Sequence, residues 1–134
     1  MIKPALFYIL IFCLAIQNGK AQTGLSKIDT LLIGTWKGTS ICQTKNSPCH
    51  DEVVVYHISK NKNLDTFYIN ASKIVNGVKE EMGILPCTYN KETNQLVSTA
   101  YKGVWTFSIE AATLEGTLVF HGDLYRIMKA VKQY

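Results

Sequence analysis

An alternation of apolar and polar residues, broken at short intervals by turn-forming residues, runs through most of the chain. In residues 66–72, Phe67, Ile69 and Ala71 share one face and the polar residues lie between them. Residues 104–110 repeat the pattern. A period of two residues is typical of a strand with one buried face. The pattern therefore predicts a β protein.

Turn signals divide the chain into separate strands. Asn76-Gly77 between β-branched residues is the strongest short hairpin signal, and His121-Gly122-Asp123 is a second tight turn. The predicted strands lie near 33–42, 52–59, 64–75, 78–88, 95–101, 103–109, 113–120 and 124–132. No helical pattern of ordinary length lies between them, which excludes a parallel α/β sheet.

The short connections predict that strands adjacent in sequence pair as antiparallel neighbours. Closing such a meander into a barrel hides its edges, whereas a two-sheet sandwich needs longer crossovers. Before the first strand, residues 24–34 place Leu25, Ile28 and Leu32 on one helical face, with Ser26 as a candidate cap. We predict an all-β fold, an eight-stranded antiparallel up-and-down barrel with a short N-terminal helical turn.

The first 21 residues have the layout of a secretory signal peptide. Lys3 precedes an apolar run over residues 5–16, and small residues precede a cleavage site after Ala21. The run is shorter than the ~20 residues that a membrane-spanning helix needs. We predict a signal peptide over 1–21 and a single β-barrel domain over 22–134. The mature protein is then exported (periplasmic, outer-envelope associated or secreted), with no membrane span.

The charge of the mature chain argues against a nucleic-acid partner. The sequence has 14 Lys and Arg against 10 Asp and Glu, and removing Lys3 and Lys20 leaves 12 − 10 = +2. This balance is weak and evenly spread. The basic stretch over residues 59–63 has no aromatic side chain that could stack on a base. We therefore expect no nucleic-acid binding.

Three cysteines remain after residue 21, and an exported protein favours a disulfide. We predict that Cys42 and Cys49 pair and restrain the loop between the first two strands. Cys87 is then expected unpaired and buried. Zinc binding by Cys42, Cys49 and His50 is the alternative, but six intervening residues exceed the usual spacing of ligands and no fourth ligand is near. We expect no metal site and no cofactor.

The stretch Gly34-Thr35-Trp36 begins the first strand directly after the helical segment. In this position the motif resembles that of the lipocalins and the wider calycin group, and "GTWKGTS" resembles the first strand of small lipocalin-like domains of exported bacterial proteins. The resemblance implies structural roles. A large indole fills the narrow end of a barrel, and glycine lets the helix approach closely. Trp36 and Gly34 are therefore expected to close one end rather than to contact a ligand.

The chain departs from the lipocalin pattern in one respect. The family places an arginine near the end of its last strand, packed across the tryptophan. Here the sole arginine is Arg126, near the start of the predicted last strand. Pairing of the last strand with the first would place Arg126 near Ser40, toward the Cys42–Cys49 loop and away from Trp36.

Bulky apolar residues on the predicted inner faces would line a cavity or fill a core. This inward set is Phe67, Ile69, Met82, Ile84, Trp105, Phe107, Leu118 and Phe120. An eight-stranded barrel can hold one small ligand or fill its interior with side chains. The bulk of these residues predicts a small or narrow cavity. The candidate ligand-binding residues are Phe67, Ile69, Met82, Trp105, Phe107, Leu118 and Arg126.

Arg126 stands out because it is one arginine among thirteen lysines, and arginine offers a planar, bidentate donor. If it faces inward with Leu124, Met128 and Ala130, it could meet an anionic head group. If it faces outward, it is a surface ion pair of small energetic value. Because long charged side chains are rarely buried, we predict an outward or structurally paired position.

The leading functional hypothesis is an exported lipocalin-like barrel that binds a small apolar or amphiphilic molecule. The ligand would enter at the end that carries the loop 42–50. No nucleophile elbow or metalloprotease motif is present, so no catalytic residue is predicted. One alternative is a protein-binding barrel, such as a periplasmic inhibitor of proteases or lysozymes, acting through the same loop. Another is a barrel isomerase or cyclase that uses Arg126 or a histidine.

Overall fold

The computed structural model describes residues 26–61 and 65–134, so the predicted signal peptide (1–21) lies outside the described residues. A short helix, α1 (Lys27–Leu32), precedes the strands. These are β1 (Gly34–Cys42), β2 (Glu52–Lys60), β3 (Thr66–Val75), β4 (Val78–Asn90), β5 (Gln95–Ser98), β6 (Gly103–Glu110), β7 (Thr113–Phe120) and β8 (Asp123–Gln133).

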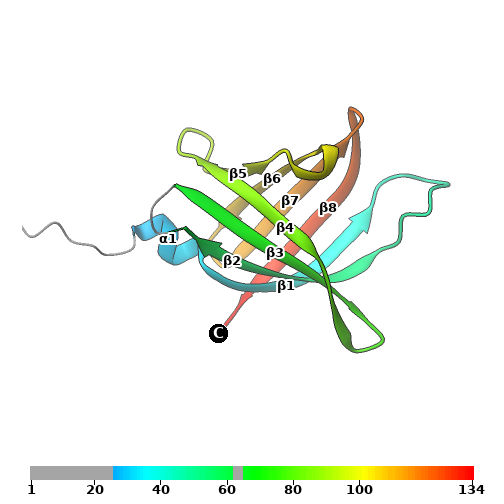
Figure 1. Cartoon of the computed structure of the whole chain (residues 1–134), viewed down its shortest axis with the longest axis horizontal. Helices are drawn as coiled ribbons and strands as arrows, with labels where there is room; N and C mark the ends of the chain where they lie inside the picture. Colours follow the sequence, from blue (N-terminus) through cyan, green and yellow to red (C-terminus); the bar gives the residue numbers. More distant parts are fainter. Residues whose placement is uncertain (1–25, 62–64) are drawn as a thin grey trace, which may run out of the picture.

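The strands close into one antiparallel barrel in sequence order, with β8 beside β1 (Figure 1). The predicted all-β, eight-stranded up-and-down barrel with a short N-terminal helix is confirmed. Asn76 and Gly77 have positive φ angles of 50° and 77° and join β3 to β4 as a two-residue turn. This is the geometry that an Asn-Gly hairpin favours.

The predicted end of the strand at 95–101 is wrong. β5 stops at Ser98, and a 3-10 turn, η1 (Ala100–Lys102), follows. Tyr101 and Lys102 have φ angles of 57° and 60°, a left-handed conformation that no strand contains. β5 is therefore short, and it pairs with β4 only at residues 88–90.

The register of β3 and β4 decides which residues of β4 face inward. Leu85 pairs with Ile69, and Leu85 and Cys87 are buried. The prediction that Ile84 faces inward is wrong, because its side chain is 50% exposed. Residues 82–87 form an apolar run without alternation, and an irregularity in pairing opposite Ala71 and Ser72 shifts the register just before it. The sequence pattern therefore could not reveal the correct face.

Reciprocal hydrogen bonds begin α1. The Ser26 hydroxyl accepts from the Asp29 N–H at 3.2 Å, and the Asp29 carboxylate accepts from the Ser26 N–H at 3.3 Å. Lys60 of β2 donates to both Asp29 oxygens at 3.1 and 3.0 Å. Burial alone would raise the pKa of Asp29, but the hydrogen bonds from Lys60 and Ser26 and the charge of Lys60 lower it below its usual value. The helix is thus held to the barrel wall.

Trp36 lies inside this end of the barrel and is fully buried. Its indole N–H donates to the Leu32 carbonyl at the end of α1, at 2.9 Å. The Lys132 ammonium lies 5.5 Å from the center of the indole ring. It also donates to the carbonyls of Thr30 and Leu31 at 2.9 and 3.0 Å. The basic residue of the last strand that packs over Trp36 is therefore a lysine.

Gly34 makes room for that lysine. Its φ of 140° is unfavourable for other residues, and a Cβ there would lie 2.9 Å from the Lys132 Cε atom. Together α1, the indole and the Lys132 side chain close this end.

Candidate functional site

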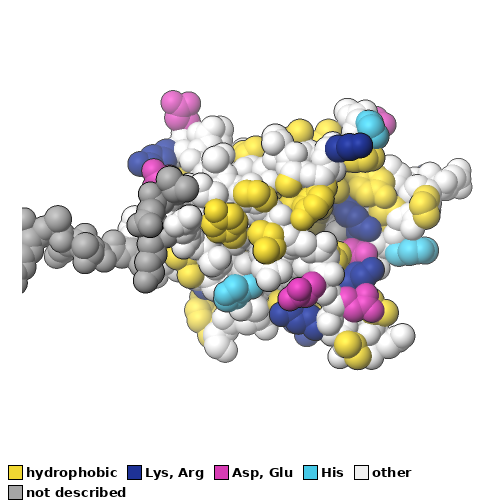
Figure 2. All heavy atoms as spheres, in the orientation of Figure 1, with side chains coloured by type: hydrophobic (Ala, Val, Ile, Leu, Met, Phe, Trp, Pro, Cys, Tyr) yellow, Lys and Arg dark blue, Asp and Glu magenta, His cyan; other side chains and the backbone are white. Residues whose placement is uncertain are grey.

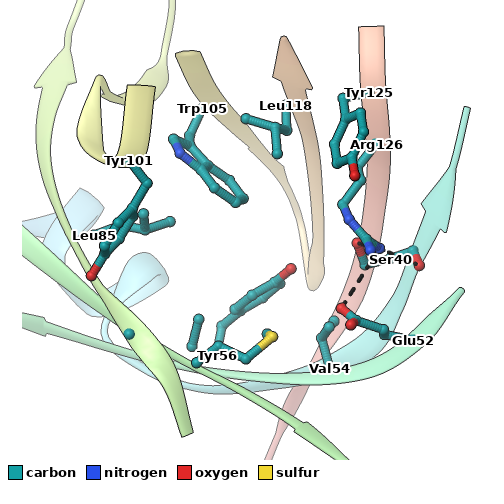
Figure 3. A pocket seen from close by; sticks show the side chains of 13 residues that line it. Ser40, Glu52, Val54, Tyr56, Leu85, Tyr101, Trp105, Leu118, Tyr125 and Arg126 are labelled. Atoms are coloured by element: carbon teal, nitrogen blue, oxygen red, sulfur yellow. Dashed lines mark hydrogen bonds and ion pairs between the residues drawn. The ribbon is translucent and has the colours of Figure 1, made fainter. Parts of the chain in front are cut away.

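A cavity of about 320 Å³ lies inside the barrel, toward the end opposite α1. This open end carries the β1–β2 loop, the β3–β4 hairpin and the β7–β8 turn (Figure 1). Four of the seven predicted ligand-binding residues meet at the cavity: Met82, Trp105, Leu118 and Arg126. They come from β4, β6, β7 and β8, so the cavity is formed by strands on several sides of the barrel (Figure 3).

The other three predicted ligand-binding residues do not line the cavity. Phe67, Ile69 and Phe107 are almost completely buried in the hydrophobic core. Phe120, also predicted inward, is partly exposed and packs against His121 and Tyr125 near the β7–β8 turn. The barrel is therefore packed solid over part of its length and hollow only near its open end.

Arg126 points into the barrel, and only 13% of its side chain is exposed. Its Nη1 atom donates to the Ser40 carbonyl at 3.3 Å and to the Ser40 hydroxyl at 3.0 Å. Its Nη2 atom donates to the His50 carbonyl at 3.0 Å. The outward position considered from the sequence is not observed; the side chain is inward and structurally paired.

A β-bulge accounts for part of this outcome. The β7–β8 register shifts between Leu118 and Val119, so that Arg126 pairs with Leu118 while Leu124 pairs with Val119. Leu124 is exposed although Arg126, two residues later, faces inward. Strict alternation from Leu124 therefore does not hold across this point.

The positive charge of Arg126 is only loosely neutralised. The Glu52 carboxylate lies 3.6 Å from the Arg126 Nη1 atom and 3.8 Å from the Lys73 Nζ atom. Both distances exceed the ~2.8 Å of a strong charge-assisted hydrogen bond. One carboxylate thus lies between two cations, and the hydrogen bonds of the guanidinium go to uncharged oxygens. Together, Arg126, Glu52 and Lys73 have a net charge of +1, and the hydrogen bonds to Ser40 and His50 hold the guanidinium in a fixed position.

Tyr56 of β2 contributes a hydroxyl to the same cavity. Its ring meets the edge of Phe107, with 5.8 Å between ring centers, and its hydroxyl points toward the cavity center (Figure 3). Burial raises the pKa of Tyr56 above its usual value, so the hydroxyl is protonated at neutral pH and can donate. Within residues 26–61 and 65–134 this hydroxyl has no hydrogen-bond partner.

The remaining wall is largely apolar. Trp105 faces the cavity, and its indole N–H donates to the Ala100 carbonyl at 3.0 Å, which fixes the ring (Figure 3). Leu85 and Leu118 lie on either side of it in the same view. An apolar wall with few convergent polar groups is typical of a small-molecule site.

The predicted Cys42–Cys49 disulfide is confirmed, with 6.0 Å between the Cα atoms. The Asp51 carboxylate accepts from the Cys42 N–H at 2.8 Å. Because the His50 carbonyl accepts a hydrogen bond from Arg126, the disulfide-restrained loop also helps to hold the guanidinium. The loop and the cavity are therefore one connected structure.

The other polar candidates lie apart from the cavity. His57 is exposed on β2, where its Nδ1 atom lies 3.1 Å from the Thr35 hydroxyl, and His121 is in the β7–β8 turn. Cys87 is a free thiol in the core, and burial raises its pKa to about 12. In the part of the chain that the structure describes, no group of three or more His, Cys, Asp or Glu side chains could hold a metal ion.

No helix in the described segments is long and apolar enough to cross a membrane.

Comparison with known proteins yields matches among solved structures. No family model matches the chain, and no curated protein matches it. A solved structure described as "The Siderocalin Ex-FABP functions through dual ligand specificities" is similar over 78% of this chain and 71% of that chain, with 14% sequence identity and a TM-score of 0.41.

Sequence reasoning missed several cavity residues. Glu52 and Tyr56 fall on the same face of β2 as Val54 and Ile58, so the period of this strand contains the signal that both face inward. Tyr101 had no such signal, because it lies in η1 rather than in a strand. Its position depends on where β5 ends.

Proposed function

We propose that this protein is an exported, non-catalytic barrel that binds a small amphiphilic molecule in the cavity at its open end. One observation carries the proposal: Arg126 projects into a largely apolar cavity, held by uncharged oxygens of Ser40 and His50. A volume of about 320 Å³ is at the small end of the ~300–1,000 Å³ range of small-molecule pockets. The ligand is therefore small, or only part of it is enclosed.

The chemistry of the walls suggests how such a ligand lies. Its apolar part contacts Trp105, Leu85 and Leu118, where burial of apolar surface stabilises it. Its polar end is an anion near Arg126 and Tyr56, since both side chains donate hydrogen bonds.

Export and the lack of catalysis belong to the same proposal. Support for export comes from the signal peptide predicted over 1–21 and from the Cys42–Cys49 disulfide, which forms in oxidising compartments. Support for binding without catalysis comes from the described lining of the cavity, which includes no histidine and no cysteine. The isomerase or cyclase alternative uses Arg126 or a histidine; Arg126 lies in the cavity, whereas its described lining contains no histidine.

Titration with decanoate and decanol, read by tryptophan fluorescence, tests the proposal. Trp105 lines the cavity and Trp36 is buried at the opposite end, so Trp105→Phe is expected to abolish the ligand-dependent change while the Trp36 signal remains. We expect micromolar binding of decanoate. Absence of binding by both compounds at that concentration contradicts the proposal.

The Arg126→Gln variant tests the head-group assignment. Losing a charge-assisted hydrogen bond of about 1.5 kcal/mol weakens decanoate binding about tenfold and leaves decanol binding unchanged. Lys129→Gln is the matched control, because this lysine is 68% exposed and paired with Glu115 outside the cavity. Equal losses of decanoate affinity in the two variants would indicate a general effect of the protein's positive charge.

The protein-binding alternative has one observation in its favour. The β1–β2 loop extends beyond the barrel in Figure 1 and is restrained by the Cys42–Cys49 disulfide. A restrained loop loses little conformational entropy on binding a partner. Inhibition of a protease or lysozyme, lost when Lys45 and Asn46 at the loop tip are replaced by alanine, would favour this function.

A further inference from the structure

One stretch of the barrel wall lacks a neighbouring strand. β4 extends over Val78–Asn90, but β5 pairs with it only at residues 88–90. On this side of β4, residues 78–87 have no strand partner in the described parts of the chain. η1, rather than a strand, is the segment that reaches this part of β4 (Figure 1).

The Tyr101 side chain spans this gap. The Tyr101 hydroxyl accepts from the Ile84 N–H at 3.3 Å and donates to the Ile84 carbonyl at 3.2 Å, the two groups that a neighbouring strand would bind. Gly83 makes this contact possible, because a Cβ there would lie 2.6 Å from the Tyr101 hydroxyl oxygen. At this point the cavity wall consists of the Tyr101 ring in contact with the backbone of Gly83 and Ile84.

The Tyr101 contact is weakly held. Both hydrogen bonds are long, and the residue is 62% exposed. Tyr101 and Lys102 are consecutive left-handed residues, which is unfavourable for side chains larger than glycine. A change of conformation in η1 therefore breaks two weak hydrogen bonds of Tyr101 and relieves an unfavourable backbone conformation.

Apolar side chains border the gap on the outside. Ile84 of β4 and Val104 of β6 are both more than 40% exposed. Figure 2 shows hydrophobic side chains gathered on the face that contains β4 and η1. Exposed apolar groups beside an opening are typical of a surface that contacts an apolar ligand.

Tyr101 and Arg126 lie on opposite walls of the cavity (Figure 3). We infer that the barrel accepts amphiphiles with one long, unbranched tail, which leaves the cavity between β4 and η1 when Tyr101 moves aside. This inference rests on the proposed function, because it requires the head group to lie near Arg126. An exit for the tail would allow a small cavity to bind a ligand that is longer than the cavity.

Octanoate, dodecanoate and hexadecanoate distinguish a closed cavity from a side opening. If the tail leaves the barrel, affinity is maintained or rises with chain length. Binding of octanoate together with loss of hexadecanoate binding overturns the inference and leaves the proposed function intact. If none of the three binds, both fail.

A hexadecanoate with a nitroxide near its last carbon locates the exit by NMR. We expect broadening of the amide signals of Ile84 and Val104, which border the gap. Broadening confined to Gly77 and Gly122, in the turns of the open end, overturns the inference because the tail then leaves through the mouth of the barrel.

Tyr101→Phe removes the two hydrogen bonds and keeps the ring, so folding is preserved. We expect dodecanoate to associate about threefold faster or more, because the hydrogen bonds no longer hold the side chain in place. Tyr134→Phe is the matched control, since Tyr134 is fully exposed at the C-terminus. Association rates that are equal in wild type and Tyr101→Phe contradict the role of Tyr101.

Discussion

Each end of the barrel contains one tryptophan and one basic residue of β8, but the two pairs have different surroundings. At the closed end, the Trp36 N–H and the Lys132 ammonium both bind carbonyls of α1, and the indole is fully buried. At the open end, Trp105 faces a cavity and Arg126 is loosely neutralised by Glu52. A tryptophan and a basic residue therefore close the barrel at one end, whereas at the other end a similar pair lines a cavity.

This difference predicts a separation of effects. Polar groups at the closed end are satisfied within the protein, so removing one leaves a partner without a hydrogen bond and lowers stability. Polar groups at the open end have unused hydrogen-bonding capacity, so changing them alters binding more than stability. Substitutions at matched positions can test whether the two ends differ in this way.

The largest expected effect is the loss of the buried indole. Trp36→Ala should lower the free energy of unfolding by about 3–5 kcal/mol, because it leaves a cavity in the packed core and deprives the Leu32 carbonyl of its donor. Trp105→Ala should cost about 1–2 kcal/mol, since that ring already faces an open space. Urea denaturation measures both. Equal losses would show that the two ends are packed alike.

An intermediate effect is expected at Asp29. Asp29→Asn should lower the free energy of unfolding by about 2 kcal/mol at neutral pH, because Lys60 loses its charged partner. The folded-state pKa of Asp29 is lowered, so its contribution is present above the unfolded value of about 3.9 and is lost as the pH falls below it. The difference between wild type and variant should therefore shrink in denaturation experiments as the pH falls through the lowered folded-state pKa of Asp29.

Asp65 supplies the matched control for that experiment. It is the second acidic residue near Lys60, at 3.8 Å, but its side chain is fully exposed. Asp65→Asn should change the free energy of unfolding by less than about 0.5 kcal/mol at any pH. A loss as large as that of Asp29→Asn would mean that burial does not strengthen the Asp29–Lys60 pair.

The smallest effect on stability is expected at Tyr56. Tyr56→Phe should change the free energy of unfolding by less than about 0.5 kcal/mol, because the hydroxyl has no partner in the described structure. The same variant should weaken decanoate binding by about fivefold, through loss of one donor to the anion. Tyr68→Phe, outside the cavity, should change neither quantity. Destabilisation by Tyr56→Phe would place its hydroxyl in the fold rather than in the site.

Much of the architecture was predictable because its causes are local in sequence. The turn at Asn76-Gly77 and the cap at Ser26 depend on residues within a few positions of each other. The disulfide was predictable because Cys42 and Cys49 flank one short loop. Together with the alternation of apolar and polar residues and the short connections, these features specified eight strands, their order and one covalent restraint.

The candidate site was less predictable, because it depends on pairing between distant segments. The inward direction of Arg126 accompanies a bulge between β7 and β8, and its partners Ser40 and His50 are more than 70 residues away in sequence. The face of Ile84 depends on the register with β3, since its own apolar run does not alternate.

The residues alone therefore determined that the chain forms a barrel, where its strands turn and which loop is cross-linked, because alternation, turn geometry and capping act over a few residues. Only the tertiary structure decided where the barrel is hollow and which polar groups face the cavity. A bulge reverses the inner and outer faces of a strand, and a short β5 leaves a gap that Tyr101 fills. Both outcomes are set by contacts across the barrel.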